Sequence, residues 1–204
     1  FADGTGARHT FTSPSTVGSI TSYTRPATIY ADLVKDTTPN PDRFSLTYRD
    51  LGVDEFEVSG SEALLVRAED RFGNGVDLTY SGTNLSTITD SVPTPDRVID
   101  FTWDTAPTPD HLTTVTDWAY VSSGVVQTSS TGSRRAHRFF YDGSGYLSGW
   151  ADPVATSGTC SSPPVHVTCL TLSGGLVTAI AKKQTYTTEN LGTLGTATRT
   201  VTTE

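Results

Sequence analysis

The amino-acid sequence predicts an all-β fold in which tandem antiparallel β-hairpins form a curved or spiralling sheet. First, short runs rich in Thr, Val and aromatic residues are bounded by Gly, Pro, Asn and Asp, which is typical of strands and turns. Second, no segment of useful length has helical periodicity. Third, a phrase that reads as strand, polar turn and strand recurs along the chain, which indicates stacked supersecondary units.

The repeated phrase locates the expected strands. Its clearest copies occupy residues 78–90 and 139–152, and each ends in Asp. Every copy contains two apolar residues three positions apart. These pairs are Leu65/Ala68, Leu85/Ile88, Leu112/Val115, Leu147/Trp150 and Val177/Ile180. We therefore predict one repeat region over residues 1–204, a fragment of a longer chain, with copies near 44–70, 76–90, 97–117, 136–152 and 167–182.

The phase of the repeat also predicts which side chains are buried. A two-stranded unit cannot bury one of its faces alone. We therefore expect neighbouring hairpins to bury each other's apolar side chains on one face of the sheet, while the other face is exposed to solvent. The expected buried layer consists of Tyr80, Leu85, Ile88, Trp103, Leu112, Val115, Tyr141, Leu147, Trp150, Leu172, Val177 and Ile180.

The turns between the strands have recognisable chemistry. Glycines in Gly73-Asn74-Gly75, Asp142-Gly143 and Gly174-Gly175 accept positive φ and favour hairpin turns. Acids that close the copies are expected to form turns by accepting hydrogen bonds from their own backbone. These acids are Asp70, Asp90, Asp117 and Asp152.

Charge and hydropathy exclude two classes of partner. The net charge is −8 and no Lys/Arg-rich run is present, which argues against nucleic acid. The basic cluster at 134–138 is expected to be a strand with alternating exposed cations. No apolar stretch approaches the roughly 20 residues of a membrane span, so membrane insertion is not expected.

The two cysteines, Cys160 and Cys169, predict a disulfide that pins an insertion in the hairpin around residues 165–167. Closing such a small loop would contribute about 2–3 kcal/mol. Two unpaired thiols are the alternative, and the spacing is poor for a metal site. A disulfide implies an oxidising compartment, so the expected location is secreted or at the cell surface.

The stretch Tyr141-Asp142-Gly143-Ser144-Gly145, followed by Leu147, resembles the YD repeat of the RHS and teneurin families. The stretch at 70–74 is similar to the D-R-x-G-N link between units of that family. The strands at 44–48 and 76–80 are similar to its x-L-T-Y strands, and residues 1–11 look like its D-G-x-G-x-x-H-x-F phrase. The resemblance covers about residues 1–118 and 136–182.

What this resemblance implies is a long β-sheet that spirals into a hollow shell, which encloses a toxic domain in bacterial members and belongs to adhesion receptors in animal relatives. The expected function is therefore structural and non-catalytic. The expected partners are neighbouring repeats of the same or a like chain, with an enclosed toxin domain or a cell-surface glycan as further candidates.

Catalytic and metal chemistry find little support in the sequence, so no catalytic residue, cofactor or metal is assigned. Paired carboxylates would have to come from Asp54, Glu55 and Glu57, but Asp54 and Glu55 should point to opposite faces of a strand. No G-x-S-x-G elbow accompanies the histidines, which are expected at the surface or in hairpins. They are His9, His111, His137 and His166.

Carbohydrate binding is the alternative function. Aromatic side chains could stack on a sugar, although aromatic residues in sheets more often pack across strands. Trp103 and Trp150 occupy repeat positions, which favours packing. Trp118 begins an insertion and is expected to be exposed, so Trp118 and Tyr120 are the candidate ligand-stacking residues.

Overall fold

The computed structural model contains strands and turns and has no helix in the part of the chain that it describes. The residues described are 1, 5–90, 97–104, 110–122, 125–127, 133–153, 160, 167–174, 176–188 and 192–202. Of these, only the backbone is described at 119–122, 125–127, 133, 182–188 and 192–202. The chain divides into two compact units, Phe1–Val98 (unit 1) and Ile99–Glu204 (unit 2).

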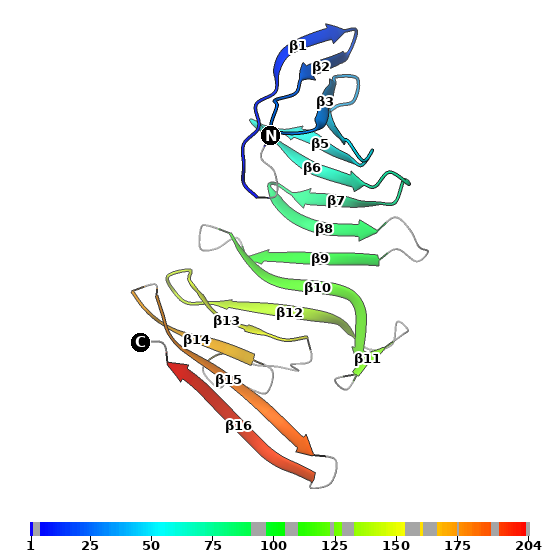
Figure 1. Ribbon diagram of the computed structural model, residues 1–204. Helices are drawn as coiled ribbons and strands as arrows, with labels where there is room; N and C mark the ends of the chain where they lie inside the picture. The colour runs from blue at the N-terminus through cyan, green and yellow to red at the C-terminus, as the bar shows by residue number, and fades with distance from the viewer. Residues whose placement is uncertain are drawn as a thin grey trace. The chain divides into compact units, whose positions relative to one another are not determined.

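Strands in both units pair antiparallel with their neighbours along the chain, which confirms the predicted all-β class of tandem hairpins (Figure 1). Unit 1 contains β1 (Thr12–Val17), β2 (Ile20–Thr24), β3 (Ala31–Asp36), β4 (Arg43–Tyr48), β5 (Val53–Ser59), β6 (Glu62–Glu69), β7 (Gly75–Ser81) and β8 (Asn84–Asp90). Beginning at the unit boundary, unit 2 contains β9 (Arg97–Asp104), β10 (His111–Ser122), β11 (Val125–Gln127), β12 (Ser133–Tyr141), β13 (Leu147–Ala151), β14 (Val167–Ser173), β15 (Leu176–Thr188) and β16 (Gly192–Thr202). The short β11 pairs only with β10 and is not part of the strand order of the sheet, in which β12 follows β10.

The pairing register gives unit 1 an apolar face and a polar face, because successive side chains of a strand alternate. The apolar face carries Leu33, Phe44, Leu46, Phe56, Leu65, Leu78, Tyr80, Leu85 and Ile88. The polar face carries ion pairs between neighbouring strands. Arg43 Nη2 lies 2.5 Å from Glu57, and Arg67 Nη1 lies 2.7 Å from Asp77.

A β-bulge explains why the apolar pairs of the repeat are three positions apart. In an ordinary strand, residues i and i+3 point to opposite faces. Here one residue between the two members of each pair has no partner on the neighbouring strand. Because of this extra residue, both members point to the same face. The extra residues are Val66, Ser86, Thr113, Ser148 and Thr178. The bulge therefore occurs at the same phase in all five copies.

Two kinds of turn connect the strands. Two-residue turns have a glycine with positive φ in first place, at Gly18, Gly60, Gly82 and Gly174. Three-residue turns, counted with one flanking residue on each side, occur at 48–52, 70–74 and 142–146. In each range the N–H of the first residue donates to the carbonyl of the fifth, and the N–H of the fourth residue donates to the carbonyl of the first. The fourth residue has positive φ, as in Gly73 and Gly145. The expectation of positive φ is therefore confirmed at Gly73 and wrong at Gly143, because the turn begins at Asp142 and needs it at Gly145.

The predicted buried layer is only half-buried, and this is a correction. Among the repeat-phase residues, Leu147 and Val177 are exposed and the others are half-buried. The buried apolar residues are instead Ala31 and Leu46 in unit 1 and Ala151, Val167 and Cys169 in unit 2.

Each unit covers part of its sheet in its own way. In unit 1 the ring of Phe1 lies edge-on to Phe56, with centroids 6.0 Å apart, on the apolar face. His9 donates its backbone N–H to the carbonyl of Phe1 and its ring lies 3.2 Å from the hydroxyl of Thr28. The N-terminal segment is thereby tied across the apolar face of unit 1, the face on which Leu46 is buried.

Candidate functional site

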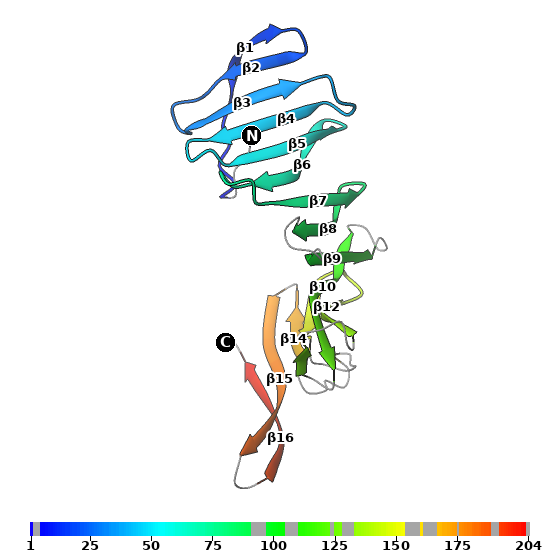
Figure 2. The same ribbon diagram turned by 90° about the vertical axis from the view of Figure 1, so that its right-hand side faces the viewer.

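The pairing between β6 and β7 stops after three residue pairs, and the two strands then diverge (Figure 2). The pairs are Arg67–Asp77, Ala68–Val76 and Glu69–Gly75. Beyond them, residues 64–66 of β6 and 78–80 of β7 have no register with each other; we call this the unit 1 seam. Across it, the hydroxyl of Tyr80 donates a 2.8 Å hydrogen bond to the carbonyl of Leu65.

Unit 2 contains an equivalent seam between β10 and β12, which diverge at the ends that carry Leu112 and Tyr141 (Figure 1). Their register includes Thr114–Arg138 but not Leu112 or Tyr141. The hydroxyl of Tyr141 donates a 2.9 Å hydrogen bond to the carbonyl of Leu112, as Tyr80 does to Leu65. The same tyrosine-to-carbonyl bridge therefore spans both seams.

The bulges account for the seams. Val66 and Thr113 are the extra residues of β6 and β10, and a bulged strand bends and twists more strongly. The bend carries each strand away from its next neighbour. The carbonyls of Leu65 and Leu112 have no partner strand across the seam, and the tyrosine hydroxyl supplies a donor to each. Burial raises the pKa of both Tyr80 and Tyr141, in agreement with their wedged position.

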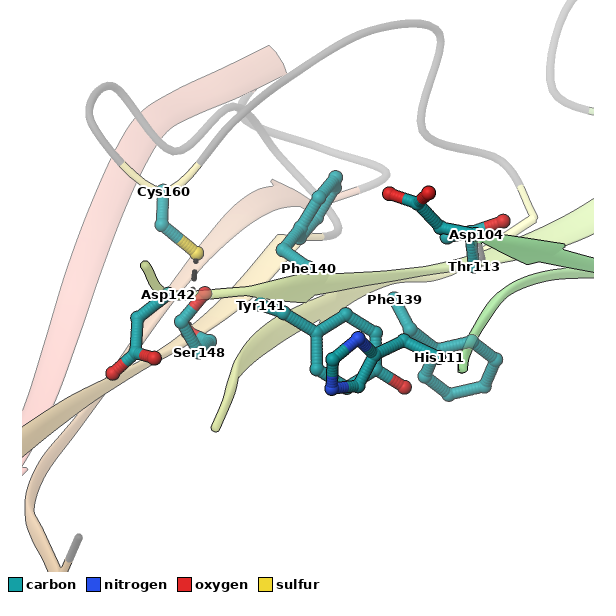
Figure 3. A pocket seen from close by; sticks show the side chains of 9 residues that line it. All are labelled: Asp104, His111, Thr113, Phe139, Phe140, Tyr141, Asp142, Ser148 and Cys160. Carbon is teal, nitrogen blue, oxygen red and sulfur yellow. Dashed lines mark hydrogen bonds between the residues drawn. The ribbon is translucent and has the colours of Figure 1, made fainter. Parts of the chain in front are cut away.

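A cavity lies at each seam. The unit 1 cavity has a volume of about 420 Å³ and is lined by Pro41, Glu57, Val58, Ser59, Leu64, Val66, Leu78, Thr79 and Tyr80. The unit 2 cavity has a volume of about 470 Å³ and is lined by Asp104, His111, Thr113, Phe139, Phe140, Tyr141, Asp142, Ser148 and Cys160 (Figure 3). Both volumes fall within the range of small-ligand or side-chain sites, about 300–1,000 Å³.

His111 lies in the β9–β10 hairpin, one of the two places expected for it, but it is buried rather than at the surface. It is 8% exposed, and its ring lies beside that of Tyr141 with centroids 4.4 Å apart. A Cβ on Gly145 would come within 3.1 Å of its Nε2 atom, so the turn glycine is needed for space as well as for positive φ. His137 is exposed and His9 half-buried, while His166 lies outside the described residues.

The predicted disulfide between Cys160 and Cys169 is confirmed, with Cα atoms 5.5 Å apart. With Phe140 it packs against Ala151 and Val167, which form the core of unit 2. The register and Figure 3 put Phe140 and Cys160 on one side of β12 and Tyr141 on the other, so this core lies opposite the repeat's apolar face. The dashed line in Figure 3 joins Sγ of Cys160 to the carbonyl oxygen of Ser148, 3.3 Å away. It is a contact rather than a hydrogen bond, because a disulfide sulfur has no proton to donate.

Gly149 makes room for the disulfide. A Cβ at this position would lie 2.5 Å from the carbonyl oxygen of Thr168 and 2.6 Å from Sγ of Cys160. Other copies of the repeat carry Arg67, Thr87 or Thr114 at the corresponding place after the bulge. The disulfide and this glycine therefore belong to one local arrangement.

The candidate ligand-stacking residues lie on β10. Trp118 is 49% exposed, as expected from its place in the sequence. Tyr120 is opposite Gln127 and Arg134 in the register, and its side chain lies outside the described part of the structure. A joint stacking role for these two residues stays a prediction.

The charged candidates are held in ion pairs and turns. Glu55 and Glu57 flank Arg43 on the polar face, whereas Asp54 accepts a 2.7 Å hydrogen bond from Tyr48 on the other face, as predicted. Residues 134–138 form a strand, as predicted, but the expectation that its arginines are exposed is wrong, because Arg134, Arg135 and Arg138 are all half-buried. Half-buried Arg134 pairs with Asp100, and half-buried Arg135 pairs with Asp117.

Asp70 forms the turn predicted for it, since its Oδ1 accepts the N–H groups of Phe72 and Asn74. Asp142, which the sequence did not single out as a turn acid, accepts from Ser144 and Tyr146 in the same pattern. Asp117 lies within β10 and binds Arg135, so its assignment as a turn acid is wrong. In the described residues no group of three His, Cys, Asp or Glu side chains could hold a metal ion.

A comparison with models of protein families finds no match, and a search of curated proteins finds none either. No helix of the described residues is long and apolar enough to cross a membrane.

Proposed function

We propose that this chain is a structural, non-catalytic β-repeat segment of an extracellular RHS/YD-type protein, and that it forms part of a shell or wall. The observation that carries the proposal is the recurrence of one set of local structures in both units. Each unit has a bulge between paired apolar residues, a seam bridged by a tyrosine hydroxyl, and an Asp-headed three-residue turn.

The half-buried apolar face supports a wall in particular. Side chains such as Tyr80 and Trp150 are covered only in part within their own unit. A second layer, either further repeats or an enclosed polypeptide, would complete their burial at about 25 cal/mol per Å² of apolar area. A toxin domain is the enclosed partner that the family resemblance suggests.

A secreted or surface location is part of the same proposal. The Cys160–Cys169 disulfide supports an oxidising environment, where such bonds persist. The negative net charge and the ion-paired polar face suit a wall surface that faces water.

Electron microscopy of the longest natural polypeptide that contains this segment tests the proposal. We expect a β-walled shell with the face of Tyr80 and Trp150 directed inward. A monomer in which both faces of the sheet remain in solvent would contradict it.

Carbohydrate binding is the second candidate, favoured by the exposure of Trp118. A glycan array probed with the protein and with Trp118→Ala separates the two. Binding that is lost in this variant would support an adhesive surface, and a blank array would leave the structural role as the better account.

A further inference from the structure

We infer that the unit 1 seam is a docking site for an extended polypeptide strand, which inserts between β6 and β7 and places an apolar side chain in the 420 Å³ cavity. This inference concerns a binding site and does not depend on the wall proposal. The equivalent cavity of unit 2 is partly walled by Cys160, so the argument is made for unit 1.

The backbone provides the first reason. Leu64 and Leu65 keep their partners on β5, and residues 78–80 keep theirs on β8, but residues 64–66 and 78–80 have no register across the seam. Such strand segments resemble the edges of a sheet, and sheet edges bind peptides by adding a strand. The seam offers an edge on each side, so one inserted strand could pair with both.

The lining of the cavity provides the second reason, because it selects the side chains of the partner. Leu64, Val66 and Leu78 supply apolar walls that fit a branched aliphatic side chain. Glu57, which is paired with Arg43, lies in the same lining, and the chain as a whole carries a charge of −8. We therefore expect the partner segment to alternate aliphatic and basic residues, so that its cations complement the negative charge of the chain.

Tyr80 provides the third reason and a sharp test. Its hydroxyl satisfies the carbonyl of Leu65 when no strand is inserted. An inserted strand would offer its own N–H to that carbonyl and compete with the tyrosine. Removing the hydroxyl should therefore strengthen binding, which is the opposite of what loss of a contact residue would do.

The test uses the full chain and a fluorescein-labelled ten-residue peptide of alternating Val and Lys, with binding followed by fluorescence anisotropy. A second peptide carries N-methyl groups on alternate backbone nitrogens and so cannot complete a ladder. We expect saturable binding of the first peptide, binding at least about tenfold weaker for the second, and about two- to tenfold tighter binding to Tyr80→Phe, each reflecting one or more hydrogen bonds.

Leu64→Lys places a cation in the cavity and should weaken binding about tenfold or more. Val17→Lys, at a residue of β1 that is 80% exposed, is the matched control and should bind like the unmodified protein. Hydrogen exchange on the unmodified chain does not depend on any variant folding. The peptide should slow exchange of the seam-facing amides within 64–66 and 78–80.

No binding of the alternating peptide, equal binding of the N-methylated peptide, or equal binding by Leu64→Lys would each overturn the inference. Protection that appears elsewhere than at the seam would do the same.

Discussion

The two units share a repeat but differ in how they obtain a core. In unit 1 the fully buried Leu46 lies on the repeat's apolar face, where Phe1 packs against Phe56. In unit 2 the core of Ala151 and Val167 lies on the opposite face, under the disulfide. The difference shows that the repeat specifies strands, turns and seams but does not fix which face of the sheet carries the buried core.

Leu46→Ala should give the largest effect and should act on unit 1. Loss of a fully buried leucine costs about 2–5 kcal/mol, because transfer and cavity terms add. Urea unfolding measures the loss, and hydrogen exchange resolved by unit shows where protection falls. Equal loss of protection in both units would break the comparison. Leu51→Ala, at a residue that is 66% exposed, is the control.

Removal of the disulfide should act on unit 2 alone. The double variant Cys160→Ser, Cys169→Ser is expected to lose about 2–3 kcal/mol of unfolding free energy. Hydrogen exchange should rise at Ala151 and Val167 and stay unchanged at Leu46. If unit 1 responded to reduction as strongly as unit 2, the two cores would not be separate.

Gly149→Ala sharpens the same point, since its added Cβ would meet backbone as well as sulfur. We expect a loss of about 1–3 kcal/mol from this overpacking, measured by urea unfolding. Gly143→Ala is the matched control in the adjacent turn, where a Cβ meets nothing within 4 Å. Similar stability for the two variants would show that the disulfide does not press on Gly149.

The seam tyrosines should show where the units agree. Tyr80→Phe and Tyr141→Phe should each cost about 1 kcal/mol, because each leaves a carbonyl without its donor. Burial raises the pKa of both tyrosines in the folded state, so their contribution is present below the ordinary tyrosine pKa of about 10 and is lost as pH rises through the folded value. Absorbance titration near 295 nm checks this. A loss in only one variant would make the seams inequivalent.

The smallest effect concerns pH and the turn of unit 1. The Asn74 side chain and the backbone N–H groups of Phe72 and Asn74 lower the pKa of Asp70. Its contribution to stability is therefore present above the ordinary Asp pKa of about 3.9 and is lost as pH falls through the lower folded value. The stability difference between the native protein and Asp70→Asn should shrink from pH 7 to pH 3. A difference that does not change with pH would contradict this account of the turn.

The sequence was sufficient to predict the all-β class, the disulfide and the Asp70 turn, because each depends on local chemistry. The three-residue spacing was recognised, but its cause, a bulge, was not, since a bulge is defined by a partner strand. For the same reason the seams were missed. The apolar pair of every copy was nevertheless the available signal, because such spacing is incompatible with a regular strand. The fully buried residues were also missed; in unit 2 they depend on Cys160, which lies outside the repeat.

The single extra residue at each bulge determines to which face of the sheet the following residues of the strand point. Deleting Val66 would restore strict alternation in β6, leaving Leu65 and Ala68 on one face but only two positions apart, and would allow β6 and β7 to pair along their whole length. The tyrosine would then have no gap to fill. Deletion of one residue, with no other change in the sequence, would thus replace the seam by continuous hydrogen-bonded pairing between β6 and β7.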